Sequence, residues 1–308
     1  MPEFDKTYDV LVAGAGVAGV AAAVASARSG LRTALVEKTV LVGGLATAGL
    51  IYGYTPLCDG VGHQVTYGIA QELLHLSIKY GPGGVPANWR SPDPQDWGCR
   101  YRTSFSPAAF VLALDELLAG AGVELWLDTL VCLPVMEGDR VRGLEVENKS
   151  GRGVLRAGCL VDATGDADVA YRAGAPCEEA DNWLSLWALE ASLEGAREAA
   201  DRDDGTPLMR GVQIAASNTG EGHPPGMRKF SGTDGKDVTD FVLTGRALLR
   251  ERYQEKQNGA EGRRDLFPLT LPAMAQFRTT RCIVGQTTLR DGMAGRQFDD
   301  SVGLVADW

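Results

Sequence analysis

The chain has 308 residues and a formal charge of −10, from 30 Lys and Arg against 40 Asp and Glu. This length suits one large domain or two modest ones, and the acidic balance argues against nucleic acid or a membrane surface as a partner. Six scattered cysteines without a C-x-x-C spacing and three dispersed histidines indicate neither a disulfide framework nor a metal site. Free thiols without an export signal favour a reducing cytoplasm.

An apolar stretch, VLVAGAGVAGVAAAVASARSG, runs from Val10 to Gly30. A signal peptide or membrane span is disfavoured, because acidic residues precede the stretch, Ala and Gly dominate it, and Arg28 interrupts it. Residues 8–13 instead predict a short buried parallel strand, followed by an Ala-rich helix to about Ser29. The turn between them carries a G-x-G-x-x-G spacing, typical of a dinucleotide site.

The glycines of this turn have distinct steric roles. Gly14 allows the sharp turn, Gly16 lets a pyrophosphate approach the backbone, and Gly19 lets the helix lie close to the sheet. A second strand is predicted at 33–37, ending on Glu37, whose carboxylate would accept bonds from ribose hydroxyls and repel a 2′-phosphate. The alternatives are a chance glycine loop and a surface charge on Glu37 paired with Lys38. We favour a site for NAD or FAD over one for NADP.

A second glycine turn, TVLVGGLATAGL, follows Glu37 and Lys38 almost at once. Binding of the first phosphate does not need a second glycine turn. A loop that runs along an extended cofactor does need one, because side chains at Gly43 and Gly44 would obstruct the approach. This favours FAD over NAD, whereas a plain tight loop is the alternative.

Strands are next predicted at 124–127 and 130–133. An antiparallel meander with turns at 138–139 and 149–151 follows, and a buried strand returns at 159–163. The returning strand ends on Ala163-Thr164-Gly165-Asp166. A glycine turn at a strand C-terminus is where open α/β sheets bind ligands.

The order GAGVAG, VEK, GGLATAG, meander and ATGDAD resembles the two-dinucleotide-fold flavoproteins, and in particular the FAD-dependent oxidoreductases that carry an ATGD(G/A)D element. The late segments LPAMAQFRTTRCIVGQTTL and FDDSVGLVADW are also similar to that group. The resemblance implies an FAD site built from the first turn, the strand-end acid, the second turn, a backbone contact to adenine and the returning turn. The residues are Gly14, Ala15, Gly16, Val17, Gly19, Glu37, Lys38, Gly43, Gly44, Ala46, Val131, Ala163, Thr164, Gly165 and Asp166.

Members of this group usually continue with another strand and a glycine-bearing helix that close over the flavin end. The sequence here stops at Asp307-Trp308. We therefore expect the chain to lack this covering segment and to bind FAD weakly or not at all on its own.

The predicted fold is α/β, with a Rossmann-like FAD-binding domain and its antiparallel meander at 1–175. An inserted α+β cap domain follows at 176–271, and 272–308 returns to the first domain. Within the cap, apolar residues at 183–193 favour a helix face or a strand. Gly, Asp and Pro at 201–236 favour exposed loops, and the spacing at 237–258 favours a helix.

Candidates for the chemistry are Arg278, Arg281 and His63, with Cys58 in the same loop as His63. Arginine suits a carboxylate or reduced flavin, and histidine suits acid–base work. Surface salt bridges, a buried thiol and a core histidine are the alternatives. The expected function is FAD-dependent hydride transfer to or from a small organic substrate. The alternative functions are a non-catalytic or incomplete subunit that needs a partner segment, and an NAD-binding module. The expected partners are a small-molecule substrate and either further copies of the chain in a homo-oligomer or a complementing C-terminal segment.

Overall fold

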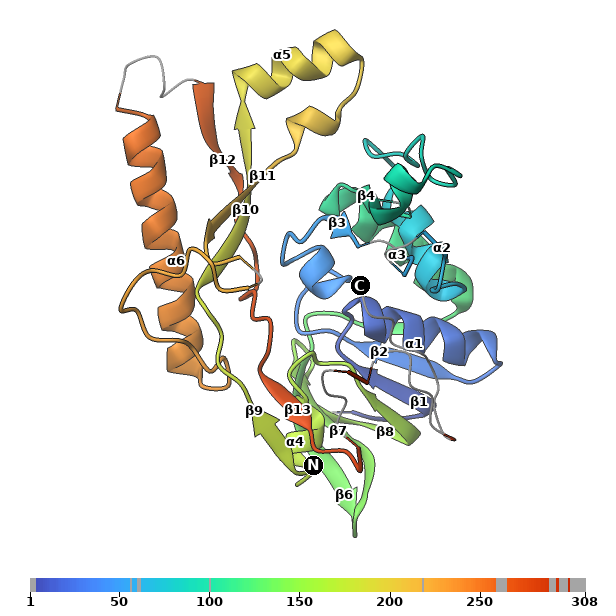
Figure 1. Ribbon diagram of the computed structural model, residues 1–308. Coiled ribbons are helices and arrows are strands. Elements are labelled where there is room, and N and C mark those ends of the chain that lie inside the picture. Colours follow the sequence, from blue (N-terminus) through green and yellow to red (C-terminus); the bar gives the residue numbers. More distant parts are fainter. Residues whose placement is uncertain are drawn as a thin grey trace.

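The computed structural model of the protein describes residues 4–55, 57–59, 62–99, 101–217, 219–258, 265–287, 292–293 and 299. Two groups of elements stand out in Figure 1: a large sheet with its helices, and a smaller sheet flanked by a long helix. The α/β class predicted from the sequence is confirmed. The domain boundaries at 175 and 271 remain an interpretation.

The large sheet has six strands in the order β5-β2-β1-β8-β7-β6. Four strands run parallel, and the last two add the predicted antiparallel meander. The parallel strands are β1 (Asp5–Ala13), β2 (Thr33–Val36), β5 (Glu124–Trp126) and β8 (Gly151–Asp162), and the antiparallel ones are β7 (Arg140–Asn148) and β6 (Leu130–Glu137).

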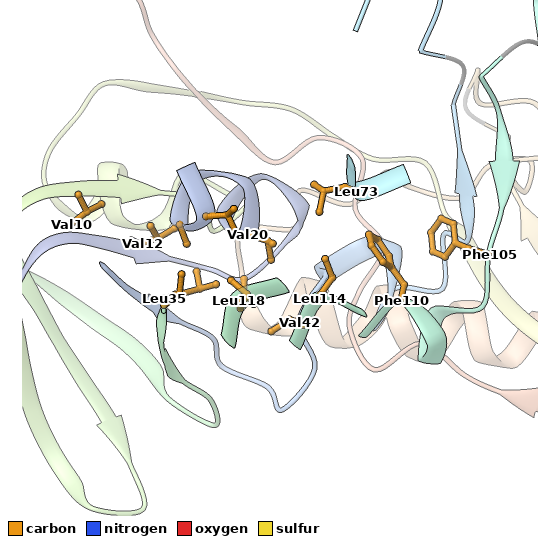
Figure 2. Packing of buried hydrophobic residues seen from close by; sticks show 14 residues of the cluster. Val10, Val12, Val20, Leu35, Val42, Leu73, Phe105, Phe110, Leu114 and Leu118 are labelled. Atoms are coloured by element: carbon orange, nitrogen blue, oxygen red, sulfur yellow. The ribbon is translucent and has the colours of Figure 1, made fainter. Parts of the chain in front are cut away.

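Alternating residues of β1 supply two cores on opposite faces of the sheet, as the period of a strand requires. Val10 and Val12 pack with α1 (Val17–Arg28), α2 (Ile69–Ser77) and α3 (Pro107–Ala121), and Figure 2 shows this cluster. The intervening residues of β1 pack instead against β7, β8 and α4. The short elements of this part are η1 (Gly44–Ala46), β3 (Gly53–Tyr54), η2 (Pro94–Cys99), β4 (Thr103–Ser104) and α4 (Asp168–Arg172).

Helix α3 shows how the local sequence sets the ends of an element. The Ser106 hydroxyl accepts from the Ala109 N–H at the N-cap, and Pro107 occupies the first turn, where its missing N–H costs nothing. Gly122 ends the helix with a φ of 74°. Helix α3 packs against α1 and against β1, the two elements that the first glycine turn joins.

One expectation about the meander is corrected. Its last strand and the returning strand at 159–163 are a single strand, β8. Residues up to Arg156 pair antiparallel with β7, whereas Val154 to Asp162 pair parallel with β1. Twelve residues reach across both neighbours, so the returning turn lies at the same edge of the sheet as the first glycine turn.

The second group is built on a three-stranded antiparallel sheet in the order β11-β10-β12. Helix α6 packs on one face of it, on the side turned away from the large sheet (Figure 1). The apolar 183–193 segment is therefore a strand continued by a helix, and the prediction of exposed loops over 201–236 is wrong for β11. The elements are β9 (Cys177–Glu179), β10 (Ser185–Ser192), α5 (Leu193–Arg202), η3 (Thr206–Leu208), β11 (Arg210–Ala215), α6 (Gly235–Lys256), β12 (Leu266–Thr270) and β13 (Arg281–Ile283).

Strand β13 pairs with β9 in a separate two-stranded sheet and lies beside α4. Among the described residues, no helix has the length and apolar character needed to cross a membrane. The same residues contain no group of three metal-ligating side chains.

Candidate functional site

The first glycine turn joins β1 to α1 at the C-terminal edge of the sheet. Gly14 has a φ of +94°, a conformation that side chains disfavour, and a Cβ there would lie 2.5 Å from the carbonyl oxygen of Ala163. A Cβ on Gly19 would collide with the carbonyl oxygen of Gly14. Both glycines are therefore explained by the fold itself, because the turn and the helix need close backbone contacts.

Gly16 has no such explanation within the protein. It is the N-cap of α1, and a Cβ built on it would meet no atom of the described chain within 4 Å. The first N–H groups of a helix have no intrahelical acceptor, and the helix dipole adds a partial positive charge there. Open space beside these groups, next to Ala15 and Val17, is suited to an anion such as a pyrophosphate.

Glu37 lies directly after β2 and is 9% exposed. Its Oε2 accepts from the Ala15 N–H at 2.9 Å, and its Oε1 accepts from the N–H and hydroxyl of Thr39 at 2.9 and 3.0 Å. A carboxylate has about four acceptor positions, so roughly one remains for a ligand hydroxyl. The strand-end acid is thus tied to the first turn, and the neighbouring Lys38 is exposed.

The second glycine loop is bound to the first turn along its backbone. The Gly43 N–H donates to the Ala15 carbonyl at 2.7 Å, and Gly16 and Gly43 form a parallel bridge. A Cβ on Gly44 would lie 2.9 Å from the Cα of Gly16. Ala46 ends the short helix η1 that follows. The structure thus brings together two glycine segments separated by the whole of α1 and β2.

The returning turn at 163–166 lies against the first turn. The Ala163 N–H donates to the Ala13 carbonyl at 2.8 Å, and Thr164 is held by the carboxylate of Asp162 at 2.7 Å. Gly165 has a φ of +86° with open space at its Cβ position. Asp166 accepts from the Thr280 hydroxyl at 2.7 Å.

Burial raises the pKa of the Asp166 carboxyl above its ordinary 3.8. The carboxylate of Asp168 also raises it, whereas the Thr280 hydroxyl, Lys38 and Arg281 act in the opposite direction. The turn therefore holds a partly buried acid that favours its neutral form more than a free aspartate does.

Val131 lies on β6, two residues after Thr129, whose N–H donates to the Glu37 carbonyl at 3.0 Å. The Val131 carbonyl oxygen accepts from Arg172 at 3.3 Å, and Arg172 also donates to the Cys132 carbonyl. An adenine contact by the Val131 carbonyl would share this acceptor with Arg172.

The two candidate arginines differ in their surroundings. Arg281 has a side chain 9% exposed, forms ion pairs with Asp168 at 3.0 Å and Glu179 at 3.2 Å, and lies over the Tyr171 ring. Arg278 is exposed, and its guanidinium has no ion pair within the described ranges. These contacts favour a structural role for Arg281, whereas Arg278 remains available to a ligand.

His63 lies in the loop before α2, with 76% of its side chain exposed, and is paired with Asp59 at 2.9 Å. Cys58 is buried in a cluster with Leu57 and Tyr101. These contacts neither support nor contradict a role for His63 or Cys58 beside the flavin.

Three polar residues of the site region gave no signal in the sequence. The side chain of Asn182 bonds to the backbone of Phe230, Arg278 and Thr279, Gln276 bonds to Gly49 and Trp187, and Thr280 bonds to Asp166. Their partners are 48 to 227 positions away in the chain, so no local spacing could reveal them.

Residues 9–188, more than half of the chain, match the family model of the FAD dependent oxidoreductases. A digeranylgeranylglycerophospholipid reductase of Methanosphaerula palustris is 26% identical over 170 residues, which are 51% of this chain and 38% of that protein. A thioredoxin reductase of Ureaplasma parvum is 34% identical over 73 residues, 24% of each chain. The chain spans about two fifths of the length of the curated reductase relatives that match half of it.

Two solved structures share the fold over most of this chain. The first is a geranylgeranyl bacteriochlorophyll reductase-like protein of Thermoplasma acidophilum, with a TM-score of 0.53 and 18% identity over 92% of this chain and 68% of that one. The second is a p-nitrophenol 4-monooxygenase of Pseudomonas putida, with a TM-score of 0.54 and 16% identity over 90% and 69%. Together with the geometry of the turns, the family match leads to one conclusion: the chain belongs to the FAD dependent oxidoreductases, and FAD is its cofactor.

Proposed function

We propose that the three turns at the edge of the large sheet hold FAD, and that the protein transfers a hydride between the flavin and a small organic substrate. The observation that carries this proposal is Gly16, where the fold leaves open the space that a side chain would fill. The residues present fit the cofactor, because helix N–H groups, a strand-end carboxylate and two further glycine loops converge there.

In this arrangement the first turn and α1 bind the pyrophosphate, and Glu37 accepts from a ribose hydroxyl. Side chains at Gly43 and Gly44 would collide with Thr47 and Gly16, so these glycines let the second loop lie against the first turn. When bound, FAD supplies the hydride acceptor or donor, and the protein supplies position and charge. Arg278, Arg281 and His63 stay the candidates for orienting the substrate or moving a proton.

The substrate would lie beneath the cap, beside the loop that follows the second glycine turn. A Cβ on Gly211 of β11 would collide with the hydroxyl of Tyr52, which places that loop against the face of the cap sheet opposite α6. The residues of that face on β10, at Trp187 and Leu189, carry no charge. The lack of charge at these two positions supports an organic substrate at this face.

The test first measures FAD binding, by titrating the protein with FAD and recording the flavin fluorescence. The loaded protein is then mixed anaerobically with nicotinamide donors and with candidate substrates, and the flavin absorbance is recorded. The reductase names of the relatives make reduction of the substrate the first direction to try. A protein that binds FAD but whose flavin exchanges electrons with none of these in either direction would argue against an enzyme.

The pairing of β8 favours a second candidate function, in which the chain is an incomplete module that needs another segment. Pairing with β7 ends at Arg156, so among the described residues the stretch 157–162 has a partner strand only on its β1 side. An open strand edge beside the returning turn can accept another strand, which would complete the site.

Cys132, Cys159, Cys177 and Cys282 are free thiols, as the proposed reducing cytoplasm requires.

This second candidate predicts little FAD in protein purified without added cofactor. The FAD content and the size in solution are measured together, because an open edge also favours self-association. A monomer with stoichiometric FAD would rule the candidate out. Recovery of FAD on adding the downstream polypeptide of a full-length relative would support it.

A further inference from the structure

A buried glutamine joins the cap sheet to the second glycine loop. Gln276 is 7% exposed. Its Oε1 accepts from the Trp187 N–H at 2.7 Å, and its Nε2 donates to the Trp187 carbonyl at 3.1 Å and to the Gly49 carbonyl. One side chain thus bonds to the central strand of the cap and to the loop that follows η1.

On the cap side, the amide of Gln276 takes the place of a neighbouring strand. The pairing of β10 with β12 ends at Leu189 and Thr270, whereas its pairing with β11 continues past Trp187 to Ser185. Beyond the end of β12, the N–H and C=O of Trp187 are satisfied by Gln276, with the two bonds that a peptide group of a paired strand would make.

On the cofactor side, hydrogen bonds continue from Gly49 to the first turn. The Gly49 N–H donates to the Gly44 carbonyl at 3.1 Å, and Gly44 packs against Gly16. The adjacent Ala48 accepts from the Ala273 N–H at 2.8 Å, so the segment that carries Gln276 is attached to the loop at a second point. An unbroken path of contacts therefore runs from Trp187 to the turn proposed to hold the pyrophosphate.

We propose that Gln276 is a positioning residue, which couples occupancy of the FAD turn to the order of the central strand of the cap. This inference rests on the proposed function. Because the amide is buried, none of its bonds can be replaced cheaply by water, so a shift of the Gly49 loop must move Trp187 or leave a polar group unpaired. Ordering of the glycine loops by FAD is thereby transmitted to the strand beneath which the substrate would lie.

The first experiment needs only the unaltered chain. Hydrogen exchange is followed by mass spectrometry with and without saturating FAD, in peptides that cover α1 with its preceding turn and peptides that cover β10. We expect slower exchange in both places. Protection of the first turn without any change in β10 would overturn the coupling but not the proposed function. No protection at the first turn would overturn both.

The second experiment replaces the amide by an apolar chain of similar length, Gln276→Met. The matched control is Gln257→Met, since among the described residues the Gln257 amide donates to the Leu266 carbonyl alone, within the cap. We expect Gln276→Met to weaken FAD binding about 2- to 30-fold, the range of measured couplings. Its first turn should still gain protection with FAD, whereas β10 should not. The control should keep both responses.

Retained protection of β10 in Gln276→Met would overturn the proposal, because the signal would then reach the cap by another route. Equal weakening of FAD binding by both variants would overturn it as well, since a general loss of cap stability would explain the effect. Circular dichroism establishes that each variant is folded. If Gln276→Met does not fold, unchanged exchange of β10 in the unaltered chain with FAD would still overturn the proposal.

Discussion

The carboxylate of Glu37 accepts a hydrogen bond from the backbone N–H of Ala15 at 2.9 Å, across 22 positions of the sequence. The end of β2 is therefore bound to the turn at the start of α1 by a hydrogen bond within the protein. The second oxygen is held by Thr39. Glu37 has a structural task in addition to the ribose contact expected of it.

Replacing Glu37 by Ala should therefore weaken FAD binding and also destabilise the fold. We expect a loss of about 1.5–3 kcal/mol in binding, the range for a hydrogen bond to a charged group, and about 1–3 kcal/mol in the free energy of unfolding from the unpaired Ala15 N–H. FAD titration and urea unfolding measure the two. Lys38→Ala, at the exposed neighbour, should change neither by as much. A lowered stability with an unchanged dissociation constant would leave Glu37 with a structural role only.

Gly16→Val and Gly19→Ala should have different effects: the first should lose FAD binding, and the second should lose stability. Gly16→Val places its side chain in open space, so the protein should fold with a near-normal melting temperature and lose FAD binding. Gly19→Ala forces a Cβ onto the Gly14 carbonyl, so it should lower the melting temperature. Thermal unfolding without cofactor separates the two. Wild-type FAD affinity in Gly16→Val would show that the pyrophosphate lies elsewhere.

The cap should depend on a buried carboxylate. The side chain of Glu190 is 1% exposed, accepts hydrogen bonds from Arg252 at 2.6 Å and Tyr253 at 3.0 Å, and forms an ion pair with Arg210 at 3.2 Å. Glu190→Ala leaves Arg252, whose side chain is 20% exposed, and the buried hydroxyl of Tyr253 without their carboxylate partner, so we expect a loss of about 1–3 kcal/mol in the free energy of unfolding. Urea unfolding followed by tryptophan fluorescence should show this loss. A change below about 1 kcal/mol would mean that water replaces the carboxylate.

The same group predicts a pH dependence. Burial acts to raise the pKa of Glu190, but the hydrogen bonds from Arg252 and Tyr253 and the charges of Arg252 and Arg210 outweigh it, so the pKa lies below its ordinary 4.5. A lowered pKa contributes stability above pH 4.5 that is lost as the pH falls through the folded-state value. The stability difference between the wild type and Glu190→Gln should therefore shrink in acid. A difference constant from neutral pH to pH 3 would contradict this assignment.

Arg278 and Arg281 should separate by stability. Arg281→Ala removes the partner of Asp168 and Glu179 from a position 9% exposed, so we expect a loss of about 1–3 kcal/mol in the free energy of unfolding. Arg278→Ala, on the surface, should leave stability within about 0.5 kcal/mol. If Arg278 orients a substrate carboxylate, its variant should instead slow flavin reduction or reoxidation. A stable Arg281→Ala protein with impaired turnover would reverse the two roles.

The sequence by itself predicted the elements that form the proposed cofactor side of the site. A strand, a glycine turn, a helix, a second strand and an acid follow one another within residues 5–37, and their roles depend on backbone sterics that operate over a few residues. The same local logic predicted α6, whose apolar positions repeat at helical spacing and whose N-cap, Asp234, accepts from two following N–H groups. Such features depend on neighbours in the chain, so they can be predicted before the chain is folded.

Only the tertiary structure decided what lies between the cofactor and the cap. The merger of two expected strands into β8 depends on two different neighbours, β7 and β1, and β11 exists because β10 offers it a ladder. The bonds of Gln276 join positions 49, 187 and 276, and nothing in their local sequence indicates it. A buried amide needs partners wherever the fold brings carbonyl and N–H groups together, and that meeting is a property of the packed chain and not of any segment of it.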